Sequence, residues 1–440
     1  MRILQIVTKN TSALDFSLPI YWGLRTQNIK LEATILFCCG NRNDILKGSN
    51  FYQSELAKLE VNLMDLASFK PSKSFLTKSL RALSCNPQKN NNYGNTIDKP
   101  FTFGYSIQKL IGFKLASRML NILENLYFGH TNFENFFEVL RPDIVILDNR
   151  NHQSFPASNK IFEKIFSSDA TKIVTPHAPH YIDPYFAFSH VNPVGKEIYS
   201  DCDVWLPFRY SKPHLKHPNL SNQFFYSGYP GLDSDWLRYC KKQIKPKKTR
   251  VQCLYIARKF FSKNTKRQGA SDFVTMEFSE VLKDLKNIRD AFLQMGVEFE
   301  LQFKPHPSGR RDLVEQLLEE ASLSHFSINL EPVYRNLSAV DVVVSPYSTA
   351  VLIPAMTGIP TVVINTDIQK KINSHWDKVC EMYQGLVFFI ERESLNPTLG
   401  QILQEGKKSF ENKDINHLRN YFPDGSISRC ITRLLKLRNN

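Results

Sequence analysis

The stretch "DVVVSPYSTAVLIPAMTGIPTVVIN", residues 341–365, predicts the fold of the second half of the chain. Its two ends, "DVVVSP" and "PTVVIN", are short apolar runs rich in Val, which is typical of buried strands. Between them Pro346 ends the first strand, Ser348 begins a helix and Gly358 returns the chain to the second strand. A buried strand, a helix and another buried strand predict a parallel sheet covered by helices.

The same alternation extends along the rest of the chain. Apolar runs that end in turns predict strands at 2–7, 33–38, 141–149, 171–181, 203–208, 223–233, 251–260, 298–307 and 326–332. Amphipathic helices are predicted at 277–296, which Gly296 ends, and at 310–322. Residues 8–25, in contrast, are predicted to be an irregular polar continuation of the first strand. The predicted fold class is therefore α/β, with doubly wound sheets.

The alternation stops at the basic segment "KKQIKPKKTR" and then starts again, which indicates two domains. The predicted boundaries are an N-terminal domain at 1–238, a basic linker at 239–250, a C-terminal domain at 251–415 and a helical tail at 416–440. Within the first domain, the polar and Pro-containing residues 68–104 indicate an exposed insertion. Ligands of such sheets bind outside the carboxyl ends of the strands.

The formal net charge of +14 indicates an anionic partner, either nucleic acid, a membrane surface or a phosphorylated substrate. The charge is spread along the chain and shows no repeated basic and aromatic pattern of the kind that single-strand binders use, which disfavours nucleic acid. The helix expected at 106–129 carries Lys109, Lys114 and Arg118. It either lies on a membrane surface or packs on the core of its domain, and the core is favoured.

The cysteines and the apolar segments indicate the compartment. The eight cysteines are scattered, and Cys38 and Cys39 are adjacent in a predicted strand, which favours buried thiols over disulfides or a metal site. The first residues, "MRILQIV", lack the longer apolar region and the cleavage site of a signal peptide. Asp341 and several prolines interrupt the longest apolar region, 338–365, so no transmembrane helix is predicted. We expect a cytoplasmic protein, with peripheral contact to the inner membrane as an open alternative.

The motif "KPHP" contains the first candidate catalytic residue. His306 stands between Pro305 and Pro307 at the end of a predicted strand, so the two prolines restrict the direction of the imidazole. Such an imidazole can donate to a phosphate oxygen or act as a general acid on a leaving group. Lys304, and Arg258 after an earlier strand, can add positive charge. The structural alternative is a histidine that only bonds to a carbonyl in a turn.

Two further strand ends carry groups that suit a nucleotide. Glu331 follows the strand "FSINL", and its carboxylate can accept hydrogen bonds from ribose hydroxyls. Ser348 and Thr349 open a helix, where hydroxyl groups and backbone N–H groups suit a phosphate. An ordinary N-cap and a solvated carboxylate are the structural alternatives. The nucleotide-binding candidates are Lys304, Pro307, Glu331, Pro332, Ser345, Tyr347, Ser348 and Thr349.

In this order, His306-Pro307, Glu331 and Ser348-Thr349 resemble motifs of the GT-B glycosyltransferases of bacterial surface polysaccharides, such as capsule or lipopolysaccharide. The nearest subgroup is the bacterial sialyltransferases and capsule transferases, which use CMP-activated sugars. The resemblance covers mainly 251–365. It implies a GT-B fold, in which two Rossmann-like doubly wound domains face a central cleft. It also implies metal-independent transfer of a sialic-acid-like or Kdo-like sugar from a nucleotide-sugar substrate, without a cofactor, to a glycan or lipid-linked acceptor.

The resemblance also implies the role of each site residue. His306 assists the departure of the phosphate, Ser348 and Thr349 bind the phosphate, and Glu331 binds the ribose. The general base belongs at the end of a strand in the N-terminal domain, where Asp148 is the positional match. This sequence reads "DNR" there instead of the family's acidic-acidic-glycine motif, so other side chains remain rivals. The rivals are His152, His177, His180 and Asp183, and the catalytic candidates we select are His306, Asp148 and His177.

Other enzymes share parts of this pattern. UDP-N-acetylglucosamine 2-epimerases have an HP motif, a segment similar to Glu331-Pro332-Val333-Tyr334 and a serine at a helix start. Their DSGG…EE signature is missing, however, because the turn here reads "SPYSTAVLIPA". CDP-glycerol phosphotransferases have a similar turn. A non-catalytic subunit that binds a nucleotide or a glycan is the alternative from a different class.

Overall fold

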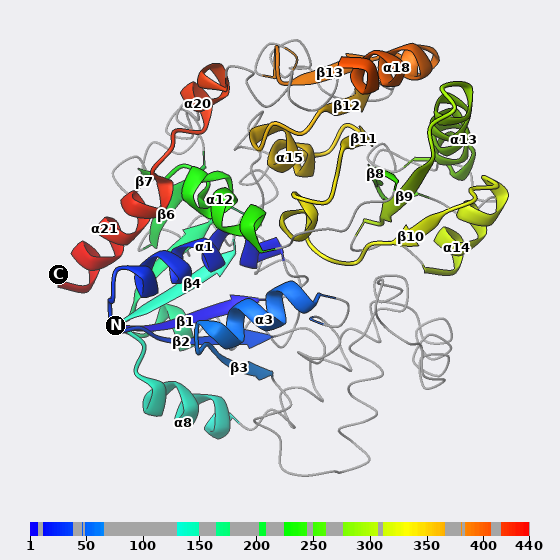
Figure 1. Ribbon diagram of the computed structural model, residues 1–440. Coiled ribbons are helices and arrows are strands. Elements are labelled where there is room, and N and C mark those ends of the chain that lie inside the picture. Colours follow the sequence, from blue (N-terminus) through cyan, green and yellow to red (C-terminus); the bar gives the residue numbers. More distant parts are fainter. Residues whose placement is uncertain are drawn as a thin grey trace, which may run out of the picture. The chain divides into compact units, whose positions relative to one another are not determined.

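The structure is a computed structural model of the 440-residue chain. It describes residues 1–7, 12–37, 46, 49–65, 130–148, 164–176, 202–207, 224–243, 250–260, 276–306, 311–365, 380, 383–405 and 415–439. The described residues form two compact units, which Figure 1 colours along the sequence. Unit 1 contains those up to Gly231 and from Gly425 onward, and unit 2 contains those from Leu232 to Asp424.

Unit 1 contains a parallel sheet of seven strands in the order β3-β2-β1-β4-β5-β6-β7. The strands are β1 (Arg2–Val7), β2 (Glu32–Phe37), β3 (Asn62–Asp65), β4 (Ile144–Asp148), β5 (Thr171–Thr175), β6 (Cys202–Leu206) and β7 (Phe224–Tyr226). β1 and β4 are neighbours, and the strands that follow each of them are added outward. This reversal of strand order is the topological switch point of a doubly wound sheet.

The described helices of unit 1 are α1 (Ser12–Thr26), α3 (Asn50–Lys58), α8 (His130–Leu140) and α21 (Ser426–Asn439). The prediction of an irregular segment at 8–25 is wrong, because α1 occupies most of it. Phe16, Ile20 and Leu24, spaced four residues apart, are all fully buried and form the core-facing side of this helix. Pro19 inside the helix obscures the pattern in the sequence, because proline usually breaks helices.

The C-terminal helix α21 belongs to unit 1, where it packs against α1 (Figure 1). The two helices meet at Gly23, where an added Cβ would lie 2.4 Å from Cγ2 of Ile427. Arg433 of α21 also donates to both carboxylate oxygens of Asp203 on β6, over 2.9 and 2.6 Å. The tail predicted at 416–440 is therefore divided between the units, because its first helix lies in unit 2 and α21 lies in unit 1.

Unit 2 contains a parallel sheet of six strands in the order β10-β9-β8-β11-β12-β13. The strands are β8 (Val251–Ile256), β9 (Phe299–Lys304), β10 (Phe326–Ile328), β11 (Val342–Pro346), β12 (Thr361–Ile364) and β13 (Val387–Ile390). Its switch point lies between β8 and β11. Two parallel, doubly wound sheets confirm the predicted α/β fold class.

The described α-helices of unit 2 are α12 (Ser234–Lys242), α13 (Phe278–Gln294), α14 (Arg311–Glu320), α15 (Leu352–Met356), α18 (Leu395–Glu405) and α20 (Asn416–Tyr421). Short 3-10 helices of unit 2 occur at η7 (Val333–Asn336), η8 (Thr349–Val351) and η9 (Arg392–Ser394), and η5 (Pro230–Leu232) includes the last residues of unit 1 before the chain enters unit 2. A capping box of Glu277 and Glu280 begins α13, and Gly296, with φ of +63°, follows its end as predicted. The predicted linker differs in part, because residues 239–242 belong to α12.

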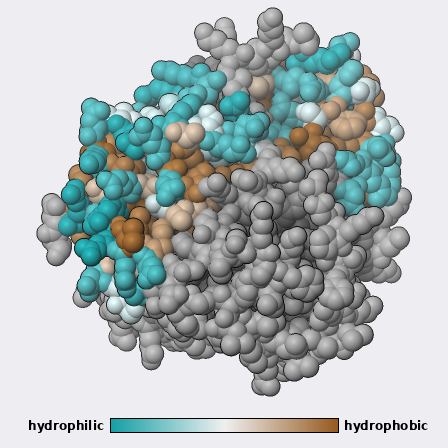
Figure 2. Space-filling model, turned by 90° about the horizontal axis from the view of Figure 1, so that it is seen from below, coloured by the Kyte–Doolittle hydropathy of each residue, from teal (hydrophilic) through white to brown (hydrophobic). Residues whose placement is uncertain are grey.

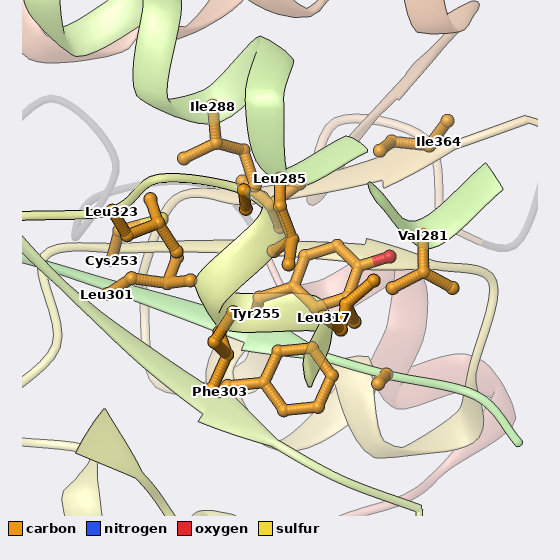
Figure 3. Close-up of a cluster of buried hydrophobic side chains, with 14 of the residues drawn as sticks. Cys253, Tyr255, Val281, Leu285, Ile288, Leu301, Phe303, Leu317, Leu323 and Ile364 are labelled. Carbon is orange, nitrogen blue, oxygen red and sulfur yellow. The ribbon is translucent and has the colours of Figure 1, made fainter. Parts of the chain in front are cut away.

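The two faces of the unit 2 sheet differ. The odd-numbered residues of β8 and β9 point into an apolar cluster with α13 and α14, which Figure 3 shows. Within it the rings of Tyr255 and Phe303 stack, with centroids 5.6 Å apart and planes inclined by 25°. Side chains alternate along a strand, so the even-numbered residues of β9 face the opposite side. These even-numbered residues are the polar ones of "FELQFK".

The described surface and cysteines bear on the remaining predictions. The five described cysteines are free, and four of them are buried, as expected for structural thiols. Among the described helices, none is long and apolar enough to span a bilayer. On the face shown in Figure 2, hydrophobic residues of the described part border hydrophilic ones. The insertion at 68–104, the helix at 106–129, Cys38 and Cys39 lie outside the described residues.

Candidate functional site

Three candidate residues of unit 2 follow neighbouring strand ends. His306 lies just beyond β9, Glu331 just beyond β10 and Ser348 just beyond β11. β9 pairs with β10 on one side and with β8 on the other, and β8 pairs with β11. All these strands are parallel, so their carboxyl ends share one edge of the sheet. The structure thus places the three residues along one edge, on both sides of the switch point between β8 and β11.

His306 is exposed to solvent, whereas Pro305 before it is buried. The backbone N–H of Ala257, after β8, donates to the carbonyl of Lys304 over 2.9 Å and ties the two strand ends together. Pro307 lies outside the described residues. The histidine therefore stands on a fixed strand end and is accessible to a ligand.

Two side chains hold the backbone of Glu331. Its N–H donates to Oδ1 of Asn329 over 3.0 Å. Its carbonyl accepts a hydrogen bond from Nζ of Lys304. Pro332 is buried and precedes η7. The Glu331 side chain is thus carried by a well-fixed backbone, and the ammonium group of Lys304, a nucleotide-binding candidate, contacts that backbone.

The turn after β11 carries the two hydroxyl residues. Ser348 is the N-cap of η8, and its Oγ accepts from the N–H of Ala350 over 3.4 Å. Thr349 is the first residue of η8, which continues as α15. Both hydroxyl residues are half-buried. The predicted helix therefore begins with a 3-10 turn and is short. A short helix has a small dipole, so an anion here would be attracted mainly by the hydroxyl groups and the backbone N–H groups.

Two other candidates in the same segment serve packing in this structure. The hydroxyl of Ser345 is fully buried and lies 2.8 Å from the carbonyl of Ile256 and 2.5 Å from that of Pro346. It therefore links β11 to β8 at the switch point. The ring of Tyr347 makes an edge contact with that of Tyr383, with centroids 6.4 Å apart. Burial raises the pKa of Tyr347 well above its ordinary value, so the phenol stays neutral.

In unit 1 the candidate base Asp148 is the last residue of β4, the strand next to the switch point. Its backbone pairs with Thr175 at the end of β5. The structure therefore places this residue at the carboxyl edge of the unit 1 sheet. The side chain of Asp148 and the rivals His152, His177, His180 and Asp183 lie outside the described residues. Within the part of the chain that is described, no group of three or more His, Cys, Asp or Glu could hold a metal ion.

The sequence analysis missed a buried charged group in the apolar core of unit 2. Asp284 on α13 is fully buried, and its carboxylate accepts from the hydroxyl of Tyr255 over 2.9 Å and from Nε of Arg392. Burial raises the pKa of Asp284 to about 6, although Arg392 and Tyr255 oppose this shift. A single Asp in an amphipathic helix is usually a surface residue, so the sequence alone did not predict that Asp284 is buried.

A cavity of about 350 Å³ lies elsewhere in unit 2. It is lined by residues of α12, by the turn between α15 and β12, and by Leu386, Ile415 and Arg419. This turn precedes β12, so the cavity lies toward the amino end of that strand. Ligands of doubly wound sheets bind at the opposite, carboxyl end, so we do not assign the nucleotide to this cavity.

Comparison with known proteins shows similarity in fold. No family model and no curated protein matches the sequence. The UDP-GlcNAc 2-epimerase of Neisseria meningitidis bound to UDP-GlcNAc is similar at a TM-score of 0.54, with 13% identity over 99% of this chain and 100% of the other. The UDP-GlcNAc 2-epimerase of Methanocaldococcus jannaschii, in complex with UDP-GlcNAc and UDP, has a TM-score of 0.53 and 11% identity over 99% of each chain. The glycosyltransferase VinC in complex with dTDP has a TM-score of 0.48, with 12% identity over 100% of both chains.

The similarity to the two epimerases covers almost the whole chain, including both units. At this level of identity it establishes the fold alone. The fold is of the GT-B class, in which one chain carries two Rossmann-like α/β units, as the sequence predicts.

Proposed function

We propose that the protein is a nucleotide-sugar-dependent glycosyltransferase. The observation that supports this most is the position of His306, Glu331 and Ser348 at one edge of the unit 2 sheet, beside its switch point. Solved structures of the same fold hold UDP or UDP-GlcNAc. A nucleotide sugar at this edge would therefore be the substrate, with the nucleotide on unit 2.

In the proposed mechanism each group has one task. Glu331 accepts hydrogen bonds from the ribose hydroxyls, and Ser348 and Thr349 donate to the phosphate. The bond between the anomeric carbon and the phosphate oxygen breaks, and that oxygen keeps the electron pair. His306 stabilises the departing phosphate by donating a hydrogen bond or a proton. The acceptor oxygen bonds to the anomeric carbon, and its proton passes to a base on unit 1, with Asp148 and His177 as candidates.

The finer assignments follow the sequence motifs. The donor is CMP-linked and carries a sialic-acid-like or Kdo-like sugar, and the acceptor is a surface glycan or a lipid-linked glycan. No metal and no further cofactor take part. The protein acts in the cytoplasm, where the net charge of +14 favours contact with the anionic inner membrane face.

A thermal-shift screen against CMP, CDP, UMP, UDP and GDP tests this proposal, because a ligand that binds the folded state raises the melting temperature. We expect the largest rise with CMP. A larger rise in melting temperature with UDP would show that the donor is UDP-linked and not CMP-linked. No rise with any of the nucleotides would contradict the proposed function. His306→Ala should then lose transfer activity while it keeps nucleotide binding.

One alternative rests on the comparisons, because both epimerases described above share the fold at TM-scores over 0.5. Incubation with UDP-GlcNAc alone, followed by proton NMR of the sugar, separates the two reactions. A transferase leaves the configuration at C2 unchanged when no acceptor is present. Conversion to the C2 epimer would show that the protein is an epimerase and not a transferase.

A further inference from the structure

A row of polar side chains leads across the sheet of unit 2 to Glu331. Nδ2 of Asn329 donates to Oε1 of Gln302 over 3.2 Å. Nε2 of Gln302 donates to Oε1 of Gln252 over 2.9 Å, and Nε2 of Gln252 donates to Oε2 of Glu300 over 3.2 Å. With the bond from the N–H of Glu331 to Oδ1 of Asn329, four hydrogen bonds run in one direction. We call these four side chains the amide row: Asn329, Gln302, Gln252 and Glu300.

The position of the amide row follows from the strand pattern. Gln252 belongs to β8, Glu300 and Gln302 belong to β9, and Asn329 directly follows β10. Gln252 is the register partner of Glu300, and Gln302 lies one pleat further along β9. The row occupies the face opposite the apolar cluster of Tyr255 and Phe303, because its β8 and β9 members have even numbers.

The carboxylate at the end of the amide row sets its direction. A carboxylate only accepts hydrogen bonds, so Gln252 must present its NH2 group to Glu300. Gln252 also donates to the carbonyl of Arg250 over 3.4 Å, which favours the same orientation. The oxygen of Gln252 then faces Gln302, the oxygen of Gln302 faces Asn329, and the oxygen of Asn329 faces the N–H of Glu331. The direction of the last bond is therefore fixed by a charge three side chains away.

Glu331 is held from both sides as a result. Asn329, which is 8% exposed, accepts from its N–H, and Lys304 donates to its carbonyl. A buried amide with one satisfied orientation holds its partner more firmly than a solvated amide, because reversing it would leave two oxygens facing each other. The side chain of Glu331 leaves the backbone between these two bonds.

We propose that Asn329, oriented by Gln302, Gln252 and Glu300, is a positioning residue that sets the preference of this protein for ribonucleotides over 2′-deoxyribonucleotides. This inference rests on the proposed function, in which Glu331 binds the ribose. A carboxylate that is held in place can accept from both ribose hydroxyls, whereas a displaced one loses the second bond. The loss of one such hydrogen bond corresponds to about a tenfold change in affinity.

The test compares dissociation constants for two nucleotide pairs, UMP with dUMP and CMP with dCMP, by isothermal titration calorimetry. The wild type should bind a ribonucleotide about tenfold more tightly than its deoxy partner. Asn329→Asp should reduce this ratio to near one. A carboxylate at position 329 places an oxygen against the oxygen of Gln302. Gln302 and Gln252 can relieve this repulsion only by reversing their amides, and a reversed Gln252 would turn its oxygen toward the carboxylate of Glu300.

The double variant Asn329→Asp with Glu300→Gln allows such a reversal. Gln302 and Gln252 can then both reverse their amides, because a glutamine at position 300 can donate to the oxygen of Gln252. We expect it to recover most of the ribose preference. Recovery is incomplete, because a reversed Gln252 loses its bond to Arg250. If these residues only served packing, the effects of Asn329→Asp and Glu300→Gln would add, and the double variant would not recover the ribose preference. Asn287→Asp is the control, because it removes one amide bond on α13, on the other face of the sheet, and should keep the ratio.

The outcomes separate the inference from the proposed function. If Glu331→Gln lowers the ratio but Asn329→Asp, folded by its melting curve, keeps it, the amide row does not position Glu331. If Asn329→Asp does not fold, Gln302→Met replaces it, because it removes the partner that orients the amide of Asn329, and an unchanged ratio in that variant overturns the inference. If the wild type binds no nucleotide, or if Glu331→Gln keeps the ratio, the proposed role of Glu331 fails and the inference with it.

Discussion

The two faces of the unit 2 sheet each carry a hydrogen-bonded polar group, but the groups differ in charge. On the apolar face, Asp284 is fully buried beside Arg392 and Tyr255. On the other face the amide row is neutral until it ends at Glu300. The energy of a buried charge depends on its partner and on pH, whereas that of hydrogen-bonded amides depends on which end of each amide faces which partner. We therefore expect changes to the first group to alter the stability of unit 2 in a pH-dependent way, and changes to the second to alter the position of Glu331.

The largest effect is expected from breaking the charged group. Arg392→Met leaves the carboxylate of Asp284 buried without its cation, so we expect unfolding to cost about 4 kcal/mol less at pH 8. Urea unfolding of the wild type and the variant measures this difference. Lys283→Met is the matched control, because the ion pair of Lys283 with Glu393 is exposed and contributes about 0.5 kcal/mol at most. Equal losses of unfolding free energy in Arg392→Met and Lys283→Met would show that the buried ion pair stabilises the protein no more than the exposed one.

The pH dependence of the charged group gives the second prediction. The pKa of Asp284 in the folded protein, about 6, is higher than its ordinary value of 3.8. The stabilising contribution of this carboxyl is therefore fully present below about pH 4 and is lost as the pH rises through 6. Between these limits the wild type should lose about 3 kcal/mol relative to Asp284→Asn. A stability difference that stays constant from pH 4 to 7 would contradict the raised pKa.

The amide row should respond differently to the loss of its middle member. Gln302→Met leaves the oxygen of Gln252 and the NH2 group of Asn329 without their partner in the row, at a cost of about 1.5 kcal/mol. The lost groups are neutral, so the cost should be equal at pH 5.5 and at pH 8. Unfolding at both values is the measurement. If the stability cost of Gln302→Met varied with pH, the stability of the amide row would depend on a titrating charge, as that of the Asp284 group does.

The smallest effect concerns the site itself. Ser348→Ala removes one hydroxyl from the proposed phosphate site, so the affinity for CMP or UDP should fall about tenfold. Thr357→Ala is the control, because it removes a hydroxyl just beyond the other end of α15, where Thr357 donates to the carbonyl of Pro354. Calorimetric titration of both variants measures the difference. Unchanged binding by Ser348→Ala would remove this residue from the site.

The candidate site was partly predictable from the sequence. His306, Glu331 and Ser348 each follow a run that the sequence predicts to be a strand, and parallel strands place such residues at one edge. The importance of Asn329 was not predictable. A single polar residue after a strand has many uses, and its bond to Gln302 depends on how β9 and β10 pair.

The fold shows the same division between local pattern and packing. The strands predicted at 2–7, 251–260 and 341–346 correspond to β1, β8 and β11, because strands inside a parallel sheet are rich in apolar residues. Helix α1 was missed, since Pro19 contradicts the local rule while Phe16, Ile20 and Leu24 pack on the core. Tertiary packing outweighed a local propensity there.

The sequence by itself determined the α/β class and which residues end the strands, because both depend on the spacing of apolar residues along the chain. Only the tertiary structure decided the strand order, the return of α21 to unit 1 and the amide row. These features join segments far apart in the sequence, such as Arg433 with Asp203 and Gln252 with Gln302. A hydrogen bond between distant residues requires the folded backbone to bring donor and acceptor to about 3 Å, and residue spacing carries no record of that distance.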